Sequence, residues 1–83
     1  MTYDYPEKIL AQLEIHGVRP VPGTRPELLH EFVSDLYRFE LRRLRRRQVA
    51  GDLPRDQYVP HVVELRKKYI LISIPVRLWT VRL

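Results

Sequence analysis

The longest periodic stretch of the chain is residues 26–51, PELLHEFVSDLYRFELRRLRRRQVAG. It begins with a proline, which suits the first turn of a helix because no hydrogen bond is needed from its nitrogen there. It ends with a glycine, which commonly closes a helix. Between them, apolar side chains recur at helical spacing: Leu28, Leu29, Phe32, Val33, Leu36, Tyr37 and Phe39. The stretch predicts one long amphipathic helix over residues 26–50, with Thr24 as its N-cap.

Two shorter helices are predicted on either side of the long one. Residues 6–16 carry a narrow apolar stripe, and Gly17 follows them as a helix stop. Residues 55–69 form the other, and Pro60 is tolerated there if the helix proper begins near Tyr58. Because the segment joining the second and third helices is short, they should lie antiparallel as a hairpin.

The last residues, 70–83, change in character. They are rich in β-branched and aromatic side chains and contain Pro75, which favours an extended segment laid across the helices. Since the chain offers no second strand, this tail would lie against the helices or pair with another molecule. The predicted fold is therefore mainly α: one small three-helix domain over residues 1–83, built on an antiparallel helical hairpin, with an extended apolar C-terminal tail. The core is expected to draw on Leu13, Leu29, Phe32, Val33, Leu36, Phe39, Val62, Leu65, Ile70 and Ile72.

Composition argues against several classes of function. The chain has no cysteine, which excludes disulfides and thiolate chemistry and fits a reducing, cytoplasmic location. The three histidines, His16, His30 and His61, show no metal-ligand spacing, and the three glycines stand apart and form no phosphate loop. We therefore predict no catalytic residue, metal or cofactor, and no enzyme activity. The N-terminus does not resemble a signal peptide, and the apolar run over residues 69–76 is too short to span a membrane.

Charge is distributed unevenly along the chain. Residues 1–37 carry three basic and six acidic side chains, whereas residues 38–83 carry twelve basic and four acidic ones. The densest part is the arginine run, which we define as Arg42, Arg43, Arg45, Arg46 and Arg47. At 100° per residue these side chains surround the helix, so the end of the long helix should project past the core. Asp35 with Arg38, and Glu40 with Arg43, are spaced to pair on its surface.

The arginine run has three interpretations. It can oppose the negative end of the helix dipole, bind an acidic protein surface, or bind nucleic acid. We favour a protein partner over nucleic acid because Gln48 is the only polar neighbour suited to phosphate contacts. A second basic group, residues 66–68, is expected to face Glu27 and Glu31 across the hairpin.

The tail supplies the remaining candidate contacts. Arg77 and Trp79 are residue types that are enriched at protein interfaces, although Trp79 is equally suited to capping the small core. The tail would also offer a surface for a second copy of the chain. Together these features predict a non-catalytic interaction or adaptor domain that presents a basic helix end and an apolar tail to an acidic protein. The alternative is a nucleic-acid-binding protein that uses the arginine run.

Overall fold

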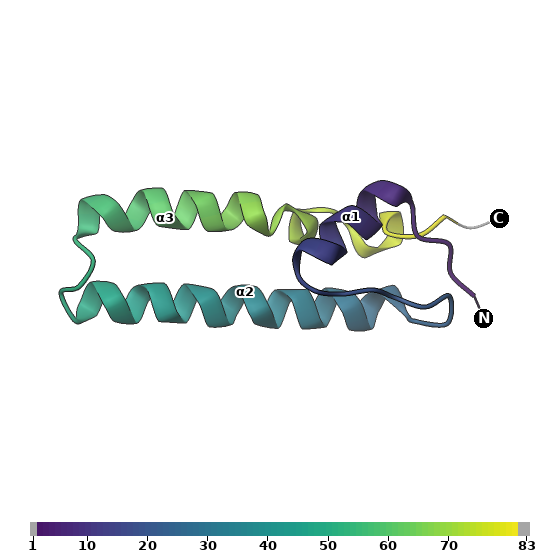
Figure 1. Cartoon of the computed structure of the whole chain (residues 1–83), viewed down its shortest axis with the longest axis horizontal. Helices are drawn as coiled ribbons and strands as arrows, with labels where there is room; N and C mark the ends of the chain where they lie inside the picture. The colour runs from purple at the N-terminus through teal and green to yellow at the C-terminus, as the bar shows by residue number, and fades with distance from the viewer. Residues whose placement is uncertain (1, 82–83) are drawn as a thin grey trace.

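The computed structural model describes residues 2–81 and has an elongated shape, 51 × 18 × 16 Å. Its helices are α1 (Glu7–Ile15), α2 (Pro26–Val49) and α3 (Arg55–Lys68). Two short 3₁₀ turns follow, η1 (Ile70–Ser73) and η2 (Val76–Leu78). The predicted mainly α fold is confirmed. Figure 1 shows α2 and α3 running side by side, with α1 and the C-terminal residues gathered at one end of α2.

The turn of the hairpin is formed as the sequence predicts. Gly51 has a φ of 83°, in the left-handed region that a residue with a Cβ atom adopts only at a cost. The amides of Asp52 and Leu53 both donate to the carbonyl of Arg47, at 2.9 and 3.2 Å. These bonds satisfy the last turn of α2 and reverse the chain within a few residues. Leu53 is buried and closes the end of the hairpin.

Pro60 lies inside α3, which begins at Arg55 and not near Tyr58 as expected. Because proline has no N–H, the carbonyl of Asp56 receives no helical hydrogen bond from it. Asp56 is exposed, so water can satisfy that carbonyl. The helix therefore continues through the proline at modest cost.

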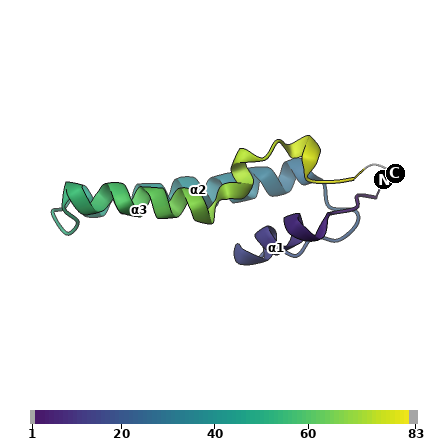
Figure 2. The same ribbon diagram turned by 90° about the horizontal axis from the view of Figure 1, so that it is seen from above.

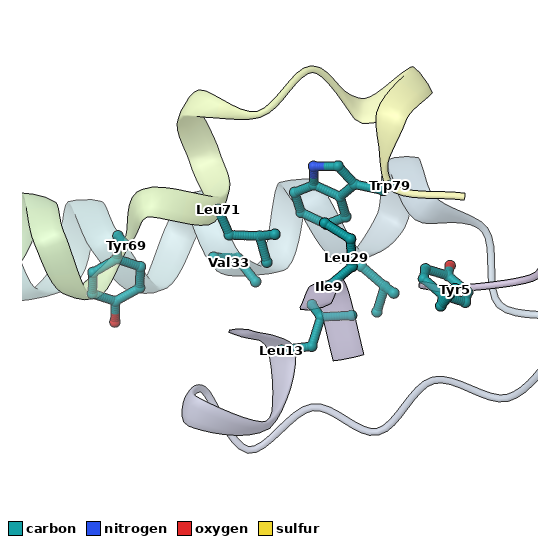
Figure 3. Packing of buried hydrophobic residues seen from close by; sticks show 8 residues of the cluster. All are labelled: Tyr5, Ile9, Leu13, Leu29, Val33, Tyr69, Leu71 and Trp79. Carbon is teal, nitrogen blue, oxygen red and sulfur yellow. The ribbon is translucent and has the colours of Figure 1, made fainter. Parts of the chain in front are cut away.

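The core lies at one end of the molecule because α3 is much shorter than α2. With 14 residues against 24, α3 covers only the C-terminal half of α2. The N-terminal half is covered by α1 and the C-terminal residues, which pack around it as Figure 3 shows. The buried cluster consists of Tyr5, Ile9, Leu13, Leu29, Val33, Tyr69, Leu71 and Trp79.

The C-terminal tail is not the extended segment that was expected. It folds back through η1 and η2, which bury Leu71 and Trp79 completely. The indole N–H of Trp79 donates to the carbonyl of Ile74 at 2.9 Å, so its polar atom is satisfied within the core. The tail also has a partner in its own chain, since the amide of Val81 donates to the carbonyl of Asp4 at 2.8 Å.

The predicted core is partly wrong along α2. Leu29 and Val33 are buried, but Phe32 and Phe39 are 49% and 54% exposed. The apolar side chains of α2 span a wider arc than its short neighbours cover, so one edge of that arc stays in solvent. Leu13 is buried as predicted, Leu36, Leu65 and Ile72 pack partly against the cluster, Val62 is partly exposed and Ile70 is exposed.

Thr24 does not cap α2. Arg25 occupies the N-cap position, and no side chain bonds to the free amides there. The Thr24 hydroxyl instead accepts from the amide of Val21 at 3.1 Å, and its carbonyl accepts from the Tyr5 hydroxyl at 2.6 Å. Thr24 thus fastens the connector between α1 and α2 to the N-terminal segment.

Trp79→Ala is expected to lower the free energy of unfolding by about 3–5 kcal/mol, because it empties the centre of a small core. Leu78→Ala is the matched control: Leu78 is largely exposed, and its loss should change stability by less than about 0.5 kcal/mol. Urea unfolding followed by far-ultraviolet circular dichroism measures both. Equal effects at the two positions would contradict the assignment of Trp79 to the core.

Candidate functional site: a basic helical arm

The part of the hairpin beyond the core forms a basic arm, which we define as residues 40–68. No residue of α3 is buried, and the arm is two helices wide with both of its broad sides in solvent. Figure 2 shows α2 and α3 extending past α1 and the C-terminal residues. The arginine run lies on this arm, as predicted from the helical wheel.

One side of the arm contains an open groove of about 370 Å³ between α2 and α3. Arg43 and Arg47 line it from α2, and Lys68 lines it from α3. The remaining lining residues are apolar, acidic or imidazole side chains: Leu44, Leu65, Glu40, Glu64 and His61. The groove therefore has three basic and two acidic side chains, a net charge of +1, and Lys68 is paired with one of the carboxylates.

The other three arginines surround a separate hollow on α2. Arg42, Arg45 and Arg46 line it together with Val49 and Ala50, and its surface is mostly apolar. Val49 is 79% exposed in this hollow. The position of α3 thus divides the arginine run into a groove pair and an outer set of three.

No arginine of the run forms an ion pair within residues 2–81. Arg42 donates from Nε to the carbonyl of Arg38 at 3.4 Å, and the Arg43 guanidinium lies 5.9 Å from the centroid of the Phe39 ring. The predicted pair of Asp35 with Arg38 is confirmed at 2.6 Å. The guanidinium groups of the run therefore remain available for an external carboxylate or phosphate.

Glu40 pairs with Lys68 at 3.2 Å, and not with Arg43 as predicted. Residues 66–68 were expected to face Glu27 and Glu31, and that expectation is also wrong. It placed the end of α3 near the start of α2, whereas α3 ends beside Glu40 in the middle of α2. Lys67 bonds within its own helix to Glu64.

A stacked pair of rings lies at the junction between the arm and the core. His16 and Tyr69 lie with ring centroids 4.3 Å apart and an interplanar angle of 15°, and Tyr37 packs 5.3 Å from Tyr69. The Tyr69 hydroxyl lies near the Glu40 carboxylate. Nε2 of His16 is buried and has no partner within the described residues. This junction joins α1, α2 and α3 through groups that titrate.

Each titrating group of the junction departs from its ordinary pKa. Burial, with the nearby charge of Lys68, lowers the pKa of His16. Burial alone would raise the pKa of Glu40, but the nearby Tyr69 hydroxyl and Lys68 outweigh it and lower that pKa. Burial and the Glu40 carboxylate together raise the pKa of Tyr69. The folded state therefore favours neutral His16, ionised Glu40 and protonated Tyr69.

The two tail residues predicted as contacts do not join the arginine run. Trp79 lies in the core and Arg77 is exposed on η2, at the opposite end of α2. Sequence reasoning also missed Phe39 and Val49 as surface residues of α2, because it assigned Phe39 to the core. The spacing of apolar residues along α2 was visible in the sequence. How much of the circumference of α2 the neighbouring elements cover was not.

No protein family, curated protein or solved structure gives a significant match to the chain. The described part of the chain contains no group of three or more potential metal ligands. Within residues 2–81, no helix combines the length and the apolar character that a membrane crossing needs.

The junction predicts how stability depends on pH. The unfolded chain protonates His16 near pH 6.5, while the folded state resists this proton, so stability should fall as pH drops through 6.5 toward the lower folded pKa. Below pH 4.5, protonation of Glu40 should remove a second contribution. His16→Phe keeps the stacked ring and should flatten the decline between about pH 7.5 and 5.5, measured by urea unfolding.

His61→Phe is the control for removing a histidine, because His61 is exposed and belongs to α3 outside the junction. This variant should keep the wild-type decline. A decline that survives in His16→Phe would show that His16 is not its source.

Proposed function

We propose that the chain is a small non-catalytic interaction module whose basic arm binds an acidic surface of another protein. The observation that carries the proposal is the arginine run, which forms no ion pair within the described chain. Each guanidinium can form a bidentate, charge-assisted bond to a carboxylate, and such bonds are stronger than neutral ones.

The surroundings of the arginines support a protein partner. Phe39 and Val49 are exposed on either side of the run, and interfaces between proteins are enriched in arginine and aromatic side chains. Surfaces that bind phosphate usually add hydroxyl and amide side chains, and residues 42–50 offer only Gln48. Nucleic acid is therefore the second candidate.

The proposal excludes Trp79 from the contact surface, because its side chain is fully buried. The predicted contact at Arg77 and the predicted cytoplasmic location remain predictions. Among residues 2–81, the arm combines the exposure and the density of positive charge that the proposal needs.

The test reverses the charge of the groove pair, Arg43→Glu with Arg47→Glu. Affinity for a fluorescent polyglutamate peptide should fall at least about tenfold, because two favourable charge contacts become repulsive. Lys8→Glu with Arg19→Glu makes the same change in net charge away from the arm and should retain most of the binding. Fluorescence anisotropy at several salt concentrations measures the affinity.

A duplex DNA of random sequence is the competing probe in the same assay. Tighter binding of the duplex, with a steep loss of affinity as salt increases, would contradict the proposal and favour nucleic acid. Equal binding of polyglutamate by the arm variant and the control variant would also contradict it.

A further inference from the structure

One exposed side of α2 carries a regular seam. Seven exposed positions alternate four and three residues apart, the spacing by which one helix packs along another in a coiled coil. They are Leu28, Phe32, Asp35, Phe39, Arg42, Arg46 and Val49. All seven side chains are exposed, so the neighbouring elements leave this side of α2 largely open to solvent.

The charge of α2 is divided between its two halves. Residues 26–37 carry three acidic side chains and no lysine or arginine, whereas residues 38–49 carry six arginines and one glutamate. Two copies of such a helix attract each other when they run antiparallel, because each acidic half then faces a basic half. A parallel pair would set the arginines against each other, and like charges in contact oppose association.

We propose that the seam binds a second copy of this chain, with the two α2 helices antiparallel. In one register, each seam position from Phe32 to Val49 faces a seam position of the second copy. This arrangement has three kinds of facing pair, which we call layers, and each layer occurs twice because the dimer is symmetric. Phe39 faces Arg42 of the second copy, and an arginine over an aromatic ring is a favourable contact. Asp35 faces Arg46 of the second copy, which would add a second cation beside a carboxylate that already pairs with Arg38 at 2.6 Å in its own chain.

The third layer sets Phe32 against Val49 of the second copy. Val49 lies in the mostly apolar hollow lined by Arg42, Arg45 and Arg46. Phe32 is about half exposed in the single chain, so the hollow would receive the half of its surface that its own chain leaves in solvent. The paired segment, residues 32–49, is about 27 Å long at 1.5 Å per residue.

This inference goes beyond the acidic partner proposed above and does not rest on it. The seam uses Arg42 and Arg46, whereas Arg43 and Arg47 line the groove between α2 and α3. Two copies joined at the seam would therefore keep both grooves open. In this dimer, the two hairpin turns lie at opposite ends.

Sedimentation equilibrium with charge-swapped variants tests the pairing. Wild-type chain should form a dimer with a dissociation constant of about 1–100 µM. Asp35→Arg and Arg46→Asp should each weaken it at least about tenfold, because each sets like charges in one layer. The double variant restores opposite charges and should recover wild-type affinity within about threefold.

Matched controls are Asp56→Arg and Arg55→Asp, which make the same changes at exposed positions of α3. They should leave the dimer within about threefold of wild type. All of these positions are exposed, so unfolding curves should show each variant folded. A wild-type chain that stays monomeric at 500 µM would overturn the proposal, as would a double variant no better than the single ones.

Cross-linking tests the direction of the helices, since the chain contains no cysteine. Phe39→Cys with Arg42→Cys should form a disulfide-linked dimer on mild oxidation, because these positions face each other. Leu28→Cys should not link to itself, since antiparallel helices hold the two copies of that position far apart. Efficient linking through Leu28→Cys would show a parallel pair and overturn the proposed arrangement.

Discussion

The unequal length of the two hairpin helices is the constraint on which the rest of the structure depends. Because α3 ends beside Glu40, the first half of α2 needs another cover, and α1 with η1 and η2 supplies it. The core is thereby confined to one end, and the arm is left with few buried side chains. The contact of Lys68 and Tyr69 with Glu40 marks the boundary between these two parts.

Local signals in the sequence were sufficient for the helices but not for their packing. Pro26 and Gly51 mark the start and the stop of α2, and both act through their own backbone geometry. The exposure of Phe32 and Phe39 depends on how far the neighbouring elements reach around α2, which no local pattern records. The same holds for the tail, where burial of Trp79 favours compact 3₁₀ turns over an extended segment.

The candidate site follows the same division. The arginine run was evident from composition, and its projection beyond the core followed from the helical wheel. Its separation into a groove pair and an outer set follows from the position of α3, as does the pairing of Glu40 with Lys68 instead of Arg43. Two surfaces of different chemistry thus lie on adjoining sides of one helix: a groove of net positive charge and a seam of apolar and charged residues. They meet where the Arg43 guanidinium lies 5.9 Å from the centroid of the Phe39 ring.

The isolated antiparallel bridge between Asp4 and Val81 holds the two ends of the described chain together, at the end of the molecule away from the hairpin turn. A mechanical force applied through both ends would act first on this single bridge, and then on the packing of Trp79. The hairpin lies outside that path of load. Stretching the chain from its ends would therefore open the core while α2 and α3 still held the geometry of the arm.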